Sequence, residues 1–308
     1  MDEKRTRSLL PLAIVFAILA VSTASIFIRK AQEEAPSLVI AAGRLTLASL
    51  ALAPVALSRH RPELGRLRGG DLLLALVSGL CLALHFATWI SSLEYTSIAS
   101  SVVLVSTAPL WVALLSPLLL HERIRPLALI GMLLALVGGS VIGVSDSCRW
   151  TEGGLACPSF AEFIQGRAML GNFLALAGAW AVTGYLIIGR KLRAGISLVP
   201  YIFVVYGIAA AALIVIMLAA GQTPFGYSPL TYLWILLLAL VPQLIGHSTY
   251  NWALKYLPAA LVSVTVLGEP IGSTILGYLV FGETPGWIKV VGAVFILAGI
   301  YLAARQNP

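Results

Sequence analysis

The chain has 308 residues, of which 59% are hydrophobic and 11% charged, and its mean hydropathy is +0.95. This composition excludes a soluble globular domain, because about a quarter of the residues in such a domain are charged. The net charge of +7 does not indicate nucleic-acid binding, because the basic residues are distributed over the connections between apolar segments. The composition is that of a membrane protein.

Ten stretches are apolar and long enough to cross a bilayer, which requires about 20 residues of α-helix. The first could be mistaken for a signal peptide, but it is longer than an apolar signal region of about 7–15 residues, and no clear cleavage site follows it. We therefore count it as a helix. The stretches cover residues 8–28, 36–57, 71–93, 97–120, 126–144, 169–188, 198–220, 229–254, 259–281 and 287–304.

The sequence repeats itself at a fixed offset of 161 residues. From residue 85 to residue 142, 13 of the 58 aligned positions are identical. The matched pairs include Tyr95 with Tyr256, Pro109 with Pro270, Glu122 with Glu283, Gly131 with Gly292 and Gly138 with Gly299. The chain therefore consists of two related halves.

Each half contains five of the apolar stretches, and an odd number means that the second half enters the membrane from the opposite side. The predicted fold is an all-α membrane protein of ten transmembrane helices in two inverted five-helix repeats. The first repeat covers residues 1–147, an extracytoplasmic loop covers 148–161, and the second repeat covers 162–308. This layout is typical of secondary transporters, whose site lies near the midplane between the repeats.

The basic residues predict the orientation. If the N-terminus is cytoplasmic, 14 of the 20 lysines and arginines lie on the cytoplasmic side. The positive-inside rule therefore places both termini in the cytoplasm and the protein in the cell (inner) membrane.

Glu269 is the sharpest functional signal, because it lies near the middle of the ninth stretch. A carboxylate at that depth costs about 2.5–3.5 kcal/mol on insertion scales, and such acids usually face a cavity. Pro270 follows directly and loosens the helix by removing one backbone donor. The alternative is a protonated Glu269 that forms a hydrogen bond between helices.

Arg44 lies within the second stretch, and its counterpart in the other half is Val205. It is a candidate for a coupling or charge role. The alternative is a structural arginine that binds the carbonyls at a helix end or extends toward the membrane surface.

Two histidines, 162 residues apart, each belong to a polar stripe. Spacings of three, four and seven residues keep each stripe on one helix face, and in lipid that face must turn inward. The stripes contain Ser78, His85, Thr88, Trp89 and Ser92 in the third stretch, and Gln243, His247, Tyr250 and Asn251 in the eighth. His85, Trp89, His247, Tyr250 and Asn251 are therefore candidates for lining a substrate path, although a single histidine is more often a structural group.

Trp111 and Trp180 are expected at a similar depth to Glu269, Arg44 and His85, counting about 1.5 Å per residue. Aromatic walls with a few ionisable groups suit an amphipathic or aromatic organic solute. The alternative is that the two tryptophans only fill space.

Signals for other chemistry are weak. Cys148 and Cys157 either form a disulfide or remain two thiols, and the chain has three cysteines, too few for a four-cysteine zinc site. No zinc-helix, nucleophile-elbow or Walker pattern is present, so we expect no metal, no cofactor and no enzyme.

Residues 93–124 and 254–285 resemble the EamA type of the drug/metabolite transporter superfamily. The resemblance rests on the ten stretches in two halves and on Pro109, Glu122, Pro270, Gly282 and Glu283. It implies export of amino acids, drugs or other metabolites, and it implies that His85 lines the cavity, as a histidine on helix 3 does in related aromatic amino-acid exporters. The family often has a Trp-Gly pair early in each half. Here the second half has Trp180-Ala181 at that position, and the first half has Leu19-Ala20.

The sequence thus predicts a transporter that moves a small organic metabolite outward by alternating access, with protons as a candidate coupling ion, as a monomer or homodimer. Uptake or uncoupled facilitation is the alternative within transport. A channel and an intramembrane enzyme are the alternatives from other classes.

Overall fold

The structure is a computed structural model that describes residues 3–120, 126–147, 149–151, 154–156, 166–257 and 259–304. It is a helical bundle with one small hairpin, in which β1 (Arg149–Thr151) pairs antiparallel with β2 (Gly154–Ala156). The first half contains α1 (Glu3–Ser22), α2 (Ala24–Ala31), α3 (Ser37–Arg59), α4 (Arg61–Leu64), α5 (Gly70–Ser92), α6 (Ile98–Val105), α7 (Ala108–Leu120) and α8 (Pro126–Ser147). The second half contains α10 (Arg167–Arg193), α11 (Leu198–Ala219), α12 (Pro229–Leu238), the π-helix η1 (Ala239–His247), α13 (Ser248–Ala253), α14 (Ala259–Thr265), α15 (Gly268–Phe281) and α16 (Trp287–Ala304).

Seven helical segments among the described residues are long and apolar enough to cross a membrane. They correspond to the first, second, third, fourth, sixth, seventh and eighth predicted stretches. The other three stretches correspond to α8, to α14 with α15, and to α16. The count of ten spans stays a prediction, as does the inverted arrangement.

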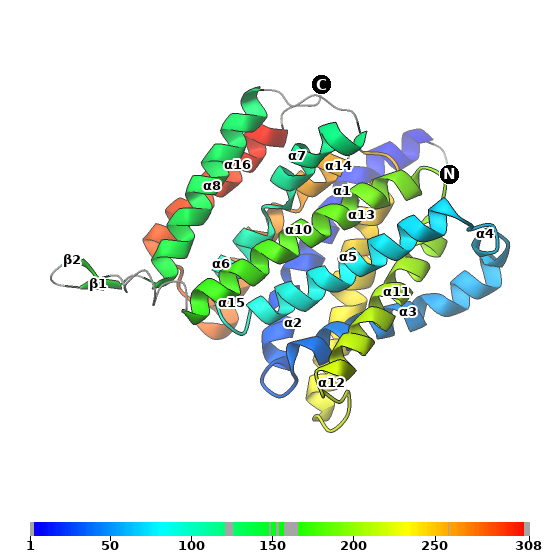
Figure 1. The fold of residues 1–308 in the computed structure, drawn as a ribbon, viewed down its shortest axis with the longest axis horizontal. Coiled ribbons are helices and arrows are strands. Elements are labelled where there is room, and N and C mark those ends of the chain that lie inside the picture. Colours follow the sequence, from blue (N-terminus) through cyan, green and yellow to red (C-terminus); the bar gives the residue numbers. More distant parts are fainter. Residues whose placement is uncertain are drawn as a thin grey trace.

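The two halves pack against each other along most of their length (Figure 1). The most extensive contacts between helices join α8 to α16, α5 to α10 and α3 to α11, and each of these pairs takes one helix from each half. The start of α1 and the end of α16 lie at the same end of the bundle as α4, and the β1–β2 hairpin lies at the opposite end (Figure 1).

Equivalent positions of the repeat make equivalent contacts. Gln32 donates from Nε2 to the carbonyl of Ile90 at 2.8 Å, and Arg193 donates from Nε to the carbonyl of Asn251 at 3.0 Å. Gln32 and Arg193 are related by the repeat offset, as are Ile90 and Asn251. The sequence repeat is therefore also a repeat of tertiary contacts.

Two equivalent prolines coincide with helix breaks. Pro109 is the second residue of α7, and Pro270 is the third residue of α15. Proline fits the first turn of a helix but cannot continue one, because it has no N–H to donate to the preceding turn. The fourth predicted stretch is thus split into α6 and α7, and the ninth into α14 and α15. The loosening expected at Pro270 is thus a full break between two helices, and an equivalent break, which was not predicted, lies before Pro109.

Two glutamates of the first half bind the N-cap residues of helices in the second half. Glu34 accepts from the N–H of Ser228 at 2.9 Å, and Glu63 accepts from the N–H of Ser197 at 2.7 Å. The backbone hydrogen bond from Ser228 holds the pKa of Glu34 below its usual value. A carboxylate with a lowered pKa stabilises the fold at neutral pH, and this contribution is lost as the pH falls through the folded-state pKa, below the ordinary value of 4.5.

We predict that Gly138→Ala and Gly299→Ala destabilise the α8–α16 pair. A Cβ on Gly138 would lie within 3.0 Å of the Gly292 carbonyl oxygen, and one on Gly299 within 3.0 Å of the Gly131 carbonyl oxygen, so the two backbones must separate. Such overpacking costs about 1–3 kcal/mol. The thermal midpoint of the purified protein measures the loss.

Gly139→Ala is the matched control, because its new Cβ would have its nearest neighbour, Leu104 Cδ2, at an ordinary 3.7 Å. Equal midpoints for Gly138→Ala and Gly139→Ala would contradict the close packing.

Candidate functional site

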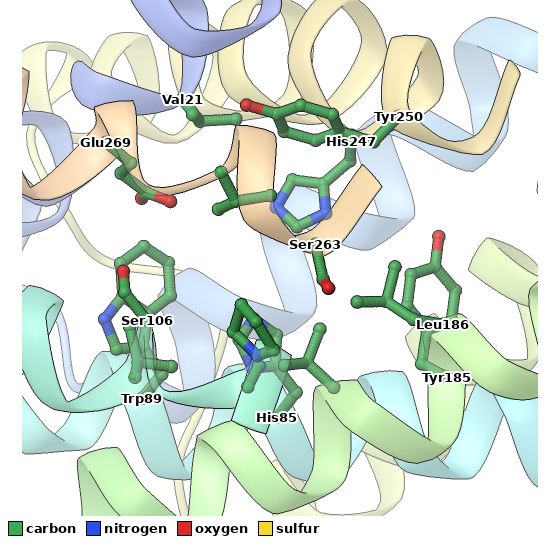
Figure 2. A pocket seen from close by; sticks show the side chains of 15 residues that line it. Val21, His85, Trp89, Ser106, Tyr185, Leu186, His247, Tyr250, Ser263 and Glu269 are labelled. Atoms are coloured by element: carbon green, nitrogen blue, oxygen red, sulfur yellow. The ribbon is translucent and has the colours of Figure 1, made fainter. Parts of the chain in front are cut away.

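A cavity lies between the two halves, and both halves contribute to its wall (Figure 2). The volume open to the centre of a water-sized sphere is about 60 Å³. This is room for a few water molecules, since one water needs about 10–15 Å³ on this measure. The lining residues are Val21, His85, Trp89, Val105, Ser106, Ala108, Pro109, Val182, Tyr185, Leu186, His247, Tyr250, Ser263, Val266 and Glu269.

His85 and Trp89 lie one turn apart on α5, and both are buried. Their rings stack at a centroid distance of 5.7 Å and an interplanar angle of 12°. His85 Nδ1 is 2.9 Å from the carbonyl oxygen of Gly178 on α10, so Nδ1 carries a hydrogen and donates it to this carbonyl. The contact fixes the ring at the cavity wall.

His247 reaches the same place from the other half of the chain. Its ring centroid is 6.3 Å from that of His85 and 5.3 Å from that of Phe86. The π-helix η1, which contains Pro242, ends at His247. π-Helical turns occur often at functional sites because they shift the register of the side chains that follow. The predicted polar stripes thus meet at their two histidines.

Glu269 lies in the first turn of α15, is 8% exposed, and faces the cavity (Figure 2). Among the described residues, its carboxylate takes part in no hydrogen bond and no salt bridge. The N-terminal end of a helix favours negative charge. This position corresponds to the cavity-facing acid of the sequence analysis, and the described residues provide no interhelical hydrogen bond of the kind that the alternative required.

Three buried polar groups at the cavity have no hydrogen-bond partner among the described residues. They are Trp89 Nε1, Ser106 Oγ and Tyr250 Oη. A buried polar group without a partner is costly, so such groups call for a ligand or a water molecule. The lining of the cavity therefore contains three residues with an unpartnered polar atom, together with the carboxylate of Glu269.

Asn251 forms a hydrogen bond with Tyr185. Asn251 does not line the cavity; it donates from Nδ2 to Tyr185 Oη at 2.5 Å and to Tyr206 Oη at 3.3 Å. Tyr185 does line the cavity, so Asn251 positions a wall residue. The sequence analysis missed Tyr185, although a tyrosine within an apolar stretch was a visible signal.

Arg44 lies behind the wall and is fully buried. Its guanidinium is 4.1 Å from the centroid of the Phe86 ring, and its Nε donates to Gln243 Oε1 at 2.8 Å. Both terminal nitrogens lack a hydrogen-bond partner among the described residues. Arg44 thus neither extends to the membrane surface nor binds a helix-end carbonyl within this part of the chain.

Trp111 and Trp180 do not line this cavity, which corrects the expected aromatic wall. They pack against each other at a centroid distance of 5.5 Å, and Trp180 is 44% exposed. Trp180 is five residues from Tyr185, and at about 100° per residue the two point to different faces of α10.

Two further expectations concern cysteines and metals. Cys148 and Cys157, the candidate disulfide, lie outside the described residues. Among the described residues no group of three or more His, Cys, Asp or Glu side chains could hold a metal ion.

The EamA-like transporter family matches the chain twice, at residues 9–144 and 169–305. An uncharacterised transporter of Archaeoglobus fulgidus is 25% identical over 294 residues, which is 96% of each chain. The pseudopaline exporter CntI of Pseudomonas aeruginosa is 27% identical and covers 97% of this chain and 98% of its own. A probable terminal-alkyne amino-acid exporter of Streptantibioticus cattleyicolor is 25% identical over 86% of this chain and 82% of its own.

One solved crystal structure shares the fold, with a TM-score of 0.67 and 21% identity over 97% of this chain and 98% of its own. The family match covers both halves and most of the chain, and the apolar helices agree with it. The chain is therefore a multi-pass membrane protein that belongs to the EamA-like transporter family of the drug/metabolite transporter superfamily.

Proposed function

We propose that this protein is a secondary transporter that exports an amino acid or a related small metabolite by alternating access. The observation that carries the proposal is the cavity between the halves, whose lining combines the carboxylate of Glu269 with three residues that have an unpartnered polar atom. Secondary transporters built from repeats bind their substrate at this kind of interface.

The cavity chemistry suits a zwitterion. Glu269 offers an acceptor for an ammonium group, whereas Trp89 Nε1, Ser106 Oγ and Tyr250 Oη offer hydrogen bonds to a carboxylate. Four valines, one leucine, Ala108 and Pro109 also line the wall and suit an apolar substituent. The space holds only a few waters, so the helices must separate to admit such a solute.

Orientation and direction are part of the proposal. The end of the bundle that contains α4 also carries Arg59, Arg61, Arg66 and Arg68. This agrees with a cytoplasmic location of that end and of both termini in the cell membrane. Outward transport is supported by the relatives that are named exporters.

A growth assay tests the function. Cells that express the protein should tolerate higher concentrations of at least one toxic amino-acid analogue or drug than cells that express Glu269→Gln at equal membrane abundance. Greater sensitivity would indicate uptake, the alternative direction, and would overturn export. Unchanged growth on a broad panel would contradict the proposed substrate class.

We predict that His85→Ala and Trp89→Ala each weaken binding of the compound identified in that assay by about 5–30-fold, equivalent to about 1–2 kcal/mol. The reason is that the stacked rings form one wall of the cavity. Ligand affinity and thermal midpoint are measured on the same purified variants.

Trp180→Ala is the matched control, since it removes a tryptophan that lies outside the lining. A lower midpoint with unchanged affinity at His85 and Trp89 would mean that the polar stripe is structural. Loss of affinity in Trp180→Ala would show that the substrate binds outside this cavity.

We predict that Glu269→Gln abolishes transport driven by a pH gradient while exchange of substrate across the membrane persists. The amide keeps the size of the side chain but cannot take up and release a proton, and exchange requires no net proton transfer. Proteoliposomes with and without a pH gradient separate the two modes. Glu33→Gln, at an exposed position, should behave like the unmodified protein, and normal gradient-driven transport by Glu269→Gln would exclude proton coupling at this residue.

A further inference from the structure

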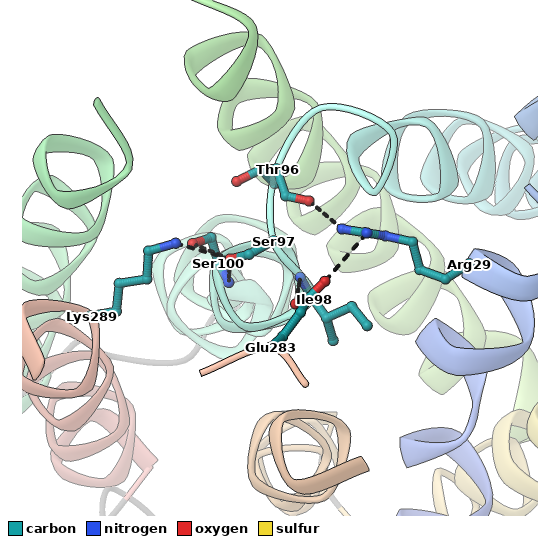
Figure 3. A network of polar contacts seen from close by, with 7 residues as sticks. All are labelled: Arg29, Thr96, Ser97, Ile98, Ser100, Glu283 and Lys289. Atoms are coloured by element: carbon teal, nitrogen blue, oxygen red, sulfur yellow. Dashed lines mark hydrogen bonds and ion pairs between the residues drawn. The ribbon is translucent and has the colours of Figure 1, made fainter. Parts of the chain in front are cut away.

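A polar network ties the two halves together at the end of the bundle opposite α4 (Figure 3). Arg29, near the end of α2, forms a salt bridge from Nη1 to Glu283 Oε1 at 3.3 Å, and Glu283 directly follows Gly282, the C-cap of α15. Arg29 Nη2 also donates to the carbonyl of Thr96 at 2.7 Å. One arginine of the first half thus binds both halves of the chain.

Glu283 and Lys289, both in the second half, make the remaining contacts of the network. Glu283 Oε2 accepts from the backbone N–H of Ile98 at 3.1 Å, at the start of α6. Lys289 Nζ on α16 donates to Ser97 Oγ, the cap residue of α6, at 3.1 Å. Three polar contacts therefore join the second half to the first, at Arg29, Ser97 and Ile98.

The network connects to the cavity through the two helices that it joins. α6 begins at Ile98 in the network and ends at Val105 in the cavity wall, about 10 Å away at 1.5 Å per residue. α15 begins with Glu269 at the cavity and ends beside Glu283 in the network. Between these points, Gly277 of α15 packs against the Ile98 side chain, so the network holds α6 and α15 together above one end of the cavity.

The Arg29–Glu283 ion pair is exposed enough to be weak, so it can break and form again. Arg29 and Glu283 side chains are each 27% exposed, and water screens an ion pair at that exposure. In contrast, Lys30 pairs with Glu33 three residues away, at 2.8 Å. Lys30 also lies over the Phe281 ring of α15, 5.2 Å from the ring centroid. Glu33 makes no hydrogen bond or ion pair to another helix among the described residues, so it provides the natural comparison.

We infer that the Arg29–Glu283 network is the latch that closes this end of the cavity, and that it must open for substrate to leave or enter there. The inference rests on the proposed alternating access. Positive-inside topology predicts that this end is extracytoplasmic.

A cysteine reporter tests the latch without any substrate. In a background with Cys81, Cys148 and Cys157 changed to serine, Ser106→Cys places a thiol in the cavity wall, and Thr223→Cys marks the loop between α11 and α12. That loop lies at the latch end, because Glu34 caps α12 there. A membrane-impermeant maleimide is applied from whichever side labels Thr223→Cys, in intact cells or inverted vesicles.

Arg29→Gln and Glu283→Gln should each raise the labelling rate of Ser106→Cys at least about threefold, whereas Glu33→Gln should leave it unchanged. Glu283→Gln keeps an oxygen acceptor for the Ile98 N–H, which separates loss of the ion pair from loss of the helix cap.

Labelling rates for Arg29→Gln and Glu283→Gln equal to that of Glu33→Gln, in protein that is fully inserted, would overturn the latch. A failed resistance assay with accelerated labelling would instead contradict the proposed transport and leave the latch standing.

Discussion

The absence of a backbone N–H in proline shapes the centre of this molecule. Pro109 and Pro270 occupy equivalent positions of the repeat, and each lies in the first turn of a helix that follows a break. The breaks place Ser106 and Glu269 beside the cavity, where continuous helices would have packed side by side. In a bilayer, such irregular backbone is tolerated where it lines a cavity or is buried in protein. The positions of Ser106 and Glu269 in the cavity lining depend on this pair of breaks.

Charge is the second constraint on the site. Arg44 is fully buried and Glu269 nearly so, yet neither has an ionic partner within 4.0 Å among the described residues. Burying a charge without a partner is expensive, and the low dielectric that makes it expensive also strengthens interactions over longer distances. Arg44 packs on Phe86, whose ring also contacts His247. The rings of Phe86 and His247 thus connect the buried cation to the cavity wall.

The repeat relates the site to the proposed movement. Equivalent contacts, such as Gln32 with Ile90 and Arg193 with Asn251, hold each half together internally. The Arg29–Glu283 network instead crosses between the halves. Rocking of the two halves about a central site, as proposed, requires this exposed cross-half contact to break while the contacts within each half stay in place.

The sequence by itself determined the apolar helices, the two related halves and the family. It also identified His85, Trp89, His247, Tyr250 and Glu269, all of which the structure places around one cavity. These features depend on local periodicity and on the cost of polar groups in lipid, and both can be read along the chain. Whether these residues bind substrate remains a prediction.

Only the tertiary structure decided how the helices rotate against one another. Rotation turned Trp180 away from the cavity, placed Asn251 behind Tyr185 and buried Arg44 against Phe86. It also placed Arg29 beside Glu283, although the two residues lie near opposite ends of the sequence. A helix pattern reports which residues share a face, but side-chain packing between helices determines what that face meets, and that information is spread over the whole sequence.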